Sequence, residues 1–542
     1  MERTKRVITV FVLVGLALAA CQAPTPVATP TPAPTPTPQI QSGGALVMGL
    51  NASPETLDPA KALGVQEASV MRQLYDTMVY VDGNHQLHAG LATHWQQSAD
   101  ATVFTFTLRS GVVFHDGTSF DAAAVKYNFD RLGNPDVGTG SASTYFTDYG
   151  STEVVDSSTA RVTFKSPHPT FLLSLGSAYV GIVSPKAAEA SGQDFGQHPV
   201  GTGPFVFKEW VPGERVVLTR NPAYAWAPDI LGHQGPAYLD SVTFRVVTED
   251  ATRLAMLQSG EASVVEQFPA QDMSWLQTDA GYYLVSGIAP GLPTVMEVNV
   301  EKAPTDELAV RQALIYAIDQ ESLVKTAFFD TQQAAHSVLA PSTLYYDPTA
   351  AQQYRFDLAK AKSLLEGAGW VDQNGDGVRE KNGKPLEISY PAYRVWENSY
   401  MELLQNMWSA AGFRVNLQQL EDAAAWDAAV AGDHNVTNMG SISFEAAVLL
   451  PSFQSANIAQ GYAFTRYRNP VLDATLDEAA QAVDAAAKTD AYARAQRLIM
   501  EQALVVPVYN FTRILAVRGQ FPGVTIDWEN WYPYFYDTHL KN

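Results

Sequence analysis

The sequence predicts a mixed α/β body, because strand-like and helix-like patterns interleave along most of its 542 residues. Phe104, Phe106 and Leu108 alternate with threonines, and residues 242–246 alternate similarly, as expected for half-buried strands. Residues 310–318 instead place apolar side chains at i, i+3, i+4, i+7 and i+8, on one face of a helix. No repeat of roughly 20–50 residues is visible, which argues against a solenoid. The length exceeds one hydrophobic core, so we expect about two to four structural units.

The first twenty residues are typical of an export signal. A basic start precedes an apolar run over residues 7–20, which is too short to span a bilayer as a helix. The run ends in Leu18-Ala19-Ala20-Cys21, which resembles the bacterial lipobox, where cleavage precedes the cysteine and its sulfur is acylated. An ordinary signal peptide with an incidental cysteine is the alternative. Cys21 is the only cysteine in the chain, which favours the lipobox and excludes a disulfide framework.

Residues 21–43 are interpreted as the lipidated cysteine and a tether. Between Pro24 and Pro38 nearly every second residue is proline, a composition that prevents a helix or an interior strand. At about 3 Å per residue in the polyproline-II conformation, this stretch reaches roughly 45 Å. A glycosylated stalk is the alternative. Either interpretation predicts a spacer between a membrane and a globular body.

The balance of charge limits the partners. The formal net charge is −21, and removal of residues 1–20, which together carry +2, makes it −23. Such an acidic surface argues against nucleic acid and against direct adhesion to anionic lipid. After the export signal, no further apolar segment is long enough to cross a membrane.

Four blocks of sequence follow one another along the chain. They are LATHW, Ser98 and FTFTLRSGVVFHDG within residues 91–117; PVGTGPF, Trp210 and RNP within 199–222; VRQAL and AID within 310–319; and AKAKSLLEGAG at 359–369. Together they resemble the large solute-binding proteins of ABC importers, the dipeptide, oligopeptide and nickel receptor family. The resemblance extends from about residue 45 to residue 510.

The resemblance implies a fold of the periplasmic-binding-protein type II kind, with a central sheet in each of two lobes. Lobe I is expected to comprise residues 44–80, 197–295 and 505–542, and lobe II residues 296–504. An accessory domain is expected to be inserted at 81–196. Ligand would bind in the cleft between the lobes, which close about a hinge near 293–298 and 502–508.

The function that the resemblance implies is capture of a small solute and its delivery to a membrane permease with its ATPase subunits. A peptide is the expected ligand; an oligosaccharide, another organic solute or a metal chelate are the alternatives. A secreted hydrolase is the alternative of a different class, but no phosphate loop, His-Glu-x-x-His pair or Gly-x-Ser-x-Gly elbow occurs in the sequence. We therefore expect no catalytic residue, cofactor or resident metal. The protein is expected to be a monomer, on the outer face of the cell membrane or in the periplasm.

Three segments are candidates for the ligand site. Gly64 and Val65 lie where peptide receptors present backbone to their ligand, and Glu266, Gln267, Phe268 and Glu297 match cleft-lining segments of the family. A salt bridge on the lobe surface is the alternative for Glu297. The third segment contains Met439, Gly440, Ser441, Ser443 and Glu445. Peptide receptors tend to carry an aspartate here that holds the peptide amino group. Ile442 stands at that position, and Glu445 would substitute if the alignment is shifted by a residue or two.

Aromatic and polar clusters complete the candidates. Trp528 begins a run of aromatic residues that invites comparison with sugar-binding sites, although core or lobe-interface packing is the favoured alternative. His85, His88 and His94 are interpreted as part of a surface turn rather than as metal ligands. Residues 372–377 resemble the first half of an EF-hand loop, but Gly383 occupies the position that needs a glutamate. We interpret this segment as a turn, with a calcium site as the alternative.

Overall fold

The computed structural model describes residues 40, 42–394, 398–458, 460–527, 529 and 531–541. Cys21, the expected export signal, most of the tether and Trp528 therefore lie outside the described residues. Residues 41–542 form one compact unit. Among the described residues, no helix combines the length and apolar character needed to cross a membrane.

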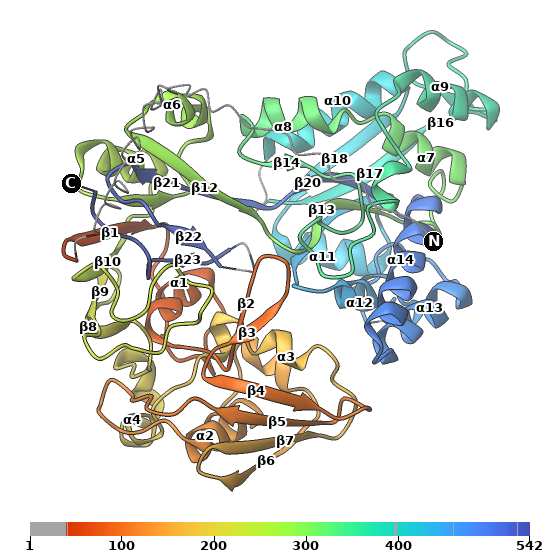
Figure 1. Ribbon diagram of the computed structural model, residues 1–542. Coiled ribbons are helices and arrows are strands. Elements are labelled where there is room, and N and C mark those ends of the chain that lie inside the picture. Colours follow the sequence, from red (N-terminus) through yellow and green to blue (C-terminus); the bar gives the residue numbers. More distant parts are fainter. Residues whose placement is uncertain are drawn as a thin grey trace, which may run out of the picture. The chain divides into compact units, whose positions relative to one another are not determined.

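The first sheet has the strand order β12-β21-β11-β1-β10-β9-β8 (Figure 1). β1 is central because Leu46, Met48 and Leu50 are fully buried, and it pairs in parallel with β10 and β11. Val242 and Phe244 are buried in β10, which confirms the strand predicted there. We keep the name lobe I for this sheet and the helices on it. Its elements are β1 (Ala45–Leu50), β8 (Phe205–Val211), β9 (Arg215–Arg220), β10 (Ser241–Val246), β11 (Val264–Glu266), β12 (Tyr282–Ile288), β21 (Thr512–Arg518), β22 (Thr525–Ile526), β23 (Pro533–Tyr534), α1 (Val65–Leu74), α5 (Asp250–Ser259) and α6 (Met273–Thr278).

A second sheet, of order β4-β5-β7-β6, lies in the segment expected to be inserted. The strand predicted around Phe104 is β5, and Phe104 packs edge-on against Phe164 in β7. Side chains of this segment and of lobe I form one continuous hydrophobic core. The elements are β2 (Val79–Val81), β3 (Leu87–Ala89), β4 (Ala92–Gln97), β5 (Val103–Leu108), β6 (Tyr149–Asp156), β7 (Thr159–Phe164), α2 (Ala122–Leu132), α3 (Phe171–Ser174) and α4 (Pro185–Ser191).

The third sheet, of order β14-β20-β13-β19, belongs to lobe II, in which β17 and β18 form a parallel pair. The predicted helix at 310–318 is α7, which ends at Tyr316, and its apolar stripe is buried. The elements are β13 (Gly291–Val298), β14 (Gln333–Ala334), β15 (Glu380–Lys381), β16 (Lys384–Pro385), β17 (Glu387–Tyr393), β18 (Arg414–Leu420), β19 (Val436–Ile442), β20 (Val505–Asn510), α7 (Leu308–Tyr316), α8 (Gln320–Phe328), α9 (Leu358–Gly367), α10 (Asn398–Ala411), α11 (Asp422–Ala431), α12 (Leu449–Phe453), α13 (Pro470–Gln481) and α14 (Ala485–Glu501).

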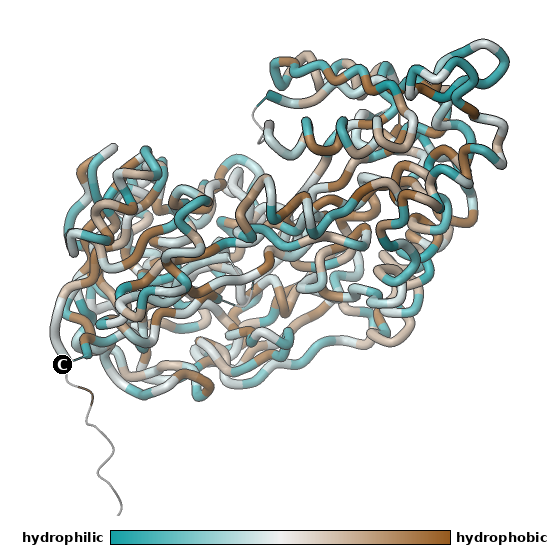
Figure 2. The backbone as a smooth tube through the Cα atoms, turned by 90° about the horizontal axis from the view of Figure 1, so that it is seen from above, coloured by the Kyte–Doolittle hydropathy of each residue, from teal (hydrophilic) through white to brown (hydrophobic). Residues whose placement is uncertain are grey.

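The lobes exchange strands at two points. β12 of lobe I continues into β13 of lobe II through Ala289–Pro290, and β20 continues into β21 through Phe511 (Figure 1). The predicted hinge segment 293–298 lies inside β13, and 502–508 reaches the first half of β20. Most buried hydrophobic residues of lobe II form a core of their own, whereas Phe444 packs into the core of lobe I and the inserted segment. Hydrophobic and hydrophilic residues alternate over short distances along the chain (Figure 2), as expected for helices and strands that bury one face and expose the other.

A buried ion pair fastens α2 to the segment that follows β1. Arg131 Nη1 and Nη2 donate to Asp58 Oδ1 and Oδ2 at 2.6 and 2.5 Å, and the Asp58 side chain is fully buried. The backbone N–H of Ala60 adds a hydrogen bond to Asp58 Oδ1 at 3.1 Å. The bidentate geometry compensates the loss of hydration of both groups.

We expect Arg131→Met to lower the unfolding free energy by about 3–5 kcal/mol, because Asp58 would stay buried without its partner. Urea denaturation of residues 22–542 measures this loss. The matched control is Arg161→Met in β7, which breaks an ion pair with Glu153 whose side chains are 44% and 60% exposed. The control substitution should lower the unfolding free energy by less than about 1 kcal/mol. Equal effects of the two substitutions would contradict the structural role of Arg131.

Candidate ligand cavity

A cavity of about 860 Å³ opens where the strands cross between the lobes. Its volume lies in the range of roughly 300–1,000 Å³ that is typical of small-molecule pockets. Residues of both lobes line it. They are Val65, Gln66, Asp250, Glu266–Gln271, Thr512–Ile514 and Trp531 from lobe I, with Thr326–Phe329, Thr331, Gln332, Ser399, Tyr509 and the crossing residue Phe511.

An ion pair and an indole ring form the floor on the lobe I side. Glu266 at the end of β11 accepts a hydrogen bond from Arg513 in β21, and both side chains are almost completely buried. Arg513 also donates to the backbone oxygen of Trp531 at 2.6 Å and to Ser69 Oγ at 3.4 Å. Its guanidinium lies 5.8 Å from the centre of the Trp531 ring, in a cation–π contact. The charges of Glu266 and Arg513 therefore neutralise each other.

The loop that follows β11 is held from behind by Arg253. This fully buried side chain donates to the backbone oxygens of Glu266, at 2.9 Å, and of Gln267. Gln267 adopts φ 45°, in the left-handed region that a residue with a Cβ rarely occupies. Asn51 Nδ2 donates to Gln267 Oε1 at 2.6 Å, and Asn51 Oδ1 accepts from Gln66 Nε2 at 2.7 Å. This network fixes three amide side chains at the cavity edge. Backbone strain such as that of Gln267 is often found at binding sites.

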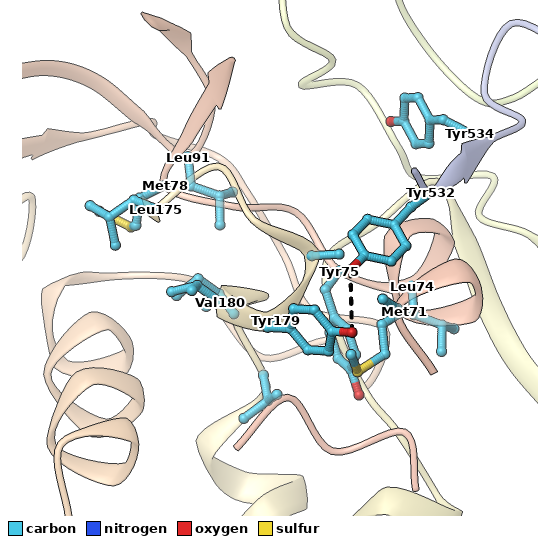
Figure 3. Packing of buried hydrophobic residues seen from close by; sticks show 14 of the residues in the cluster. Met71, Leu74, Tyr75, Met78, Leu91, Leu175, Tyr179, Val180, Tyr532 and Tyr534 are labelled. Carbon is cyan, nitrogen blue, oxygen red and sulfur yellow. Dashed lines mark hydrogen bonds between the residues drawn. The ribbon is translucent and has the colours of Figure 1, made fainter. Parts of the chain in front are cut away.

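The start of α1 is positioned by tyrosines. Tyr179 donates to the backbone oxygen of Gly64 at 2.9 Å, and the Tyr532 hydroxyl lies 3.3 Å from that of Tyr179 (Figure 3). A Cβ on Gly64 would meet Glu67 Oε2 at 2.2 Å, so the Glu67 carboxylate would have to move to admit any other residue. Val65 lines the cavity, whereas Gly64 supports it through its backbone.

The third predicted segment lies away from the cavity walls. Met439, Gly440 and Ser441 belong to β19, and the Ser443 N–H donates to Pro290 O at 2.9 Å. Ile442, which stands where peptide receptors carry an aspartate, is 46% exposed.

Glu445 instead joins lobe II to the inserted segment. Its Oε1 accepts from Thr170 at 3.2 Å, and its Oε2 lies 4.0 Å from Lys488 Nζ. Burial raises the pKa of Glu445 and lowers that of Lys488. The ring of the neighbouring Phe444 packs 5.7 Å from that of Tyr145, so apolar and polar contacts coincide at this junction.

Glu297 is buried inside lobe II, neither on its surface nor on the cavity wall. Its carboxylate has no ion-pair partner among the described residues and lies beside the backbone N–H groups of Phe464 and Thr465. Burial raises the pKa of Glu297 to about 8, an effect that those N–H groups oppose. Thr437, its cross-strand neighbour in β19, is also fully buried.

The predicted turn is correct for residues 372–377 but only in part for the histidines: His85 lies between β2 and β3, whereas His88 and His94 lie in strands β3 and β4. His88 Nε2 lies 2.9 Å from Asp82 in the β2–β3 hairpin. The Asp372 carboxylate accepts from the N–H groups of Gly375 and Gly377, which shapes the predicted turn. Carboxylate oxygens of Asp372, Asp376 and Glu380 lie within 4.8 Å of one another. The first two residues are exposed and Glu380 is partly exposed. Glu380, at the ninth position of the EF-hand pattern, was not among the residues predicted from the sequence.

Sequence patterns did not reveal the lobe II wall. Thr326 and Phe328 belong to the end of α8, Phe329 follows it directly, and Tyr509 belongs to β20. Apolar residues at such positions cannot be told from core residues in the sequence. Arg513 was missed because nothing in its local sequence indicates a partner 247 positions away.

The family of the chain follows from its sequence. Residues 86–457 match the model described as bacterial extracellular solute-binding proteins, family 5 middle, and the chain belongs to this family. Its members are solute-binding proteins of ABC importers rather than enzymes. The predicted class of protein is thereby confirmed.

Individual relatives agree with this assignment. A glutathione-binding protein, GsiB, from Salmonella paratyphi A is 32% identical over 477 residues, which cover 85% of this chain and 88% of the relative. Among solved structures, HbpA2 from Haemophilus parasuis has a TM-score of 0.80 at 24% identity, covering 92% of this chain and 100% of that one. NikA from Brucella suis in complex with Fe(III)-EDTA has a TM-score of 0.79 at 22% identity, with coverages of 92% and 100%. These structures confirm the predicted two-lobed α/β fold.

Glu297 should make the stability of the protein depend on pH. Its carboxyl ionises near 4.5 when unfolded but near 8 when folded, so the folded state loses stability as the pH rises through this interval. Glu297→Gln removes this loss and should be more stable than the parent by on the order of 3–5 kcal/mol at pH 9, and by little at pH 4. Thermal unfolding at both pH values measures the difference.

The control for removing one carboxylate is Glu402→Gln on the exposed face of α10. It should show no comparable change between the two pH values. A Glu297→Gln advantage of the same size at pH 4 and pH 9 would show that burial of the charge is not its cause.

Proposed function

We propose that the protein captures a short peptide in the cavity at the strand crossing and delivers it to the permease and ATPase subunits of an importer. The observation that carries this proposal is the lining of one cavity by side chains of both lobes. A ligand that contacts both lobes stabilises the arrangement in which both contacts are made, by as much as it prefers that arrangement. The importer can then recognise the loaded receptor through the relative position of its lobes.

The chemistry of the walls supports a peptide. Gln66, Gln267, Gln271 and Gln332 offer amide donors and acceptors that match peptide groups. Aromatic rings of Phe268, Phe328, Phe329, Tyr509, Phe511 and Trp531 offer surfaces for side chains. The relative GsiB is named for binding glutathione, itself a peptide derivative. Among the predicted residues, we assign Val65, Glu266, Gln267 and Phe268 to the walls, with Gly64 behind them.

We further propose that the mature protein is a monomer held outside the cytoplasmic membrane by lipid on Cys21. Two or more acyl chains give durable anchoring, whereas one chain is marginal. The proline-rich tether would then leave the body free to reach a permease in the same membrane.

Thermal-shift screening of residues 22–542 tests the ligand class. Libraries of di- to pentapeptides, oligosaccharides and metal chelates are compared, because a ligand at about 100 times its Kd stabilises the folded state by about 2.7 kcal/mol. We expect stabilisation by peptides. Stabilisation only by sugars or by chelates would replace the peptide assignment.

Phe511→Ala tests the position of the site. We expect the Kd of an identified ligand to rise at least about ten-fold, since a large apolar contact at the centre of the cavity is lost. Isothermal titration measures the change. The control is Phe356→Ala, whose ring is 48% exposed and lies outside the lining, and it should leave the Kd unchanged. An unaltered Kd for Phe511→Ala would remove this cavity from consideration.

Cys21→Ala tests the anchor. In a bacterial host fed a radioactive fatty acid, the parent chain should be labelled and should sediment with membranes. The variant should not be labelled, because Cys21 is the only cysteine and no thiol remains to be acylated. Labelling of Cys21→Ala would contradict the lipobox.

A further inference from the structure

The charged side chains that line the cavity are already neutralised by protein groups. They are Asp250, Glu266 and Arg513. Arg513 is committed to Glu266, to Ser69 and to the backbone of Trp531. Asp250 pairs with Arg253, which lies behind the wall and also holds the backbone oxygens of Glu266 and Gln267. Among the residues that the structure describes, the lobe I wall therefore has no unpaired cation to offer a ligand.

The lobe II wall contains no charged side chain among the described residues. Its members are Thr326, Ala327, Phe328, Phe329, Thr331, Gln332, Ser399 and Tyr509. The internal positions outside the described residues cannot supply a cation either, because they are Val395, Trp396, Glu397, Ala459, Trp528 and Asn530. A ligand carboxylate directed between these walls would lose its hydration without gaining a partner.

Charge farther from the cavity acts in the same direction. The net charge of −21 disfavours the approach of anions and favours that of cations. The Asp250 side chain is 53% exposed and presents carboxylate oxygens at the rim. Inside, the rings of Phe268 and Phe329 line the cavity, and aromatic rings attract ammonium and guanidinium groups.

We propose that the cavity discriminates by charge: it accepts peptides whose enclosed side chains are neutral or basic, and it rejects acidic ones. This inference rests on the proposed capture of peptides and adds the class of peptide to it. Glutathione has one more carboxylate than amino groups, so this receptor differs in ligand from the relative that is named for glutathione.

The test uses three tripeptides that differ in one side chain: Ala-Phe-Gln, Ala-Phe-Glu and Ala-Phe-Lys. Their binding to the full-length, detergent-solubilised protein is measured by isothermal titration at pH 7, with glutathione alongside. We expect Ala-Phe-Glu to bind at least about ten-fold more weakly than Ala-Phe-Gln, and Ala-Phe-Lys to bind as tightly or more tightly. The discrimination should persist in about 0.5 M salt, which screens the long-range field but not a local desolvation cost.

A cation placed on the wall should relax the discrimination. Gln271→Lys adds a positive charge to the lobe I wall, and Thr326→Lys adds a positive charge to the lobe II wall. Both residues are exposed and line the cavity. Each variant should reduce several-fold the preference for Ala-Phe-Gln over Ala-Phe-Glu, measured as the ratio of their Kd values. The matched control is Gln277→Lys in α6, which adds the same charge on an exposed position outside the lining and should leave the ratio unchanged.

The outcomes separate the two proposals. Binding of none of the tripeptides would overturn peptide capture and this inference with it. Equal binding of all three, or tight binding of glutathione, would overturn the charge rule and leave peptide capture in place. If Gln277→Lys weakened the preference for Ala-Phe-Gln as much as the wall variants do, the charge rule would also be overturned. The weaker preference would then come from the net charge of the protein and not from the cavity wall.

Discussion

The structure depends on the main-chain pairing of two strand pairs that pass from one sheet into the other. β12 and β21 are antiparallel neighbours in lobe I, and their continuations β13 and β20 are antiparallel neighbours in lobe II. Each lobe closes its own hydrophobic core, so apolar packing does not merge them into one body. The cavity lies at this crossing, and for that reason Tyr509 and residues 511–514 contribute to both of its walls.

The ion pair of Glu266 and Arg513 organises the lobe I side of that cavity. A buried ion pair offers little net stability over apolar residues of similar size. Here it has a geometric consequence, since Arg513 also holds the backbone and the ring of Trp531. The end of β11, the start of β21 and the C-terminal aromatic segment are thus tied together by one side chain. Among the described residues, the same contacts leave the cavity without an unpaired cation, which is the basis of the charge rule proposed for its ligands.

Buried carboxylates elsewhere have different consequences. Glu297 lies deep in lobe II without a counter-ion among the described residues, and its raised pKa makes it a source of instability above neutral pH. Glu445 bonds to Thr170 and lies near Lys488, so it connects lobe II with the inserted segment. That segment is also fastened to lobe I, through Arg131 and Asp58. It therefore contacts both sides of the strand crossing.

The sequence by itself determined the fold class, the family and the elements with clear periodicity, such as β5, β10 and α7. It also placed Val65, Glu266, Gln267 and Phe268, which line the cavity, because these belong to segments with a family resemblance. Tertiary structure alone decided the points where strands change lobes, the pairing of Glu266 with Arg513 and the lobe II wall. Local sequence patterns indicate which residues are buried but not which other residues they pack against. Contacts between residues hundreds of positions apart arise only when separate sheets come together.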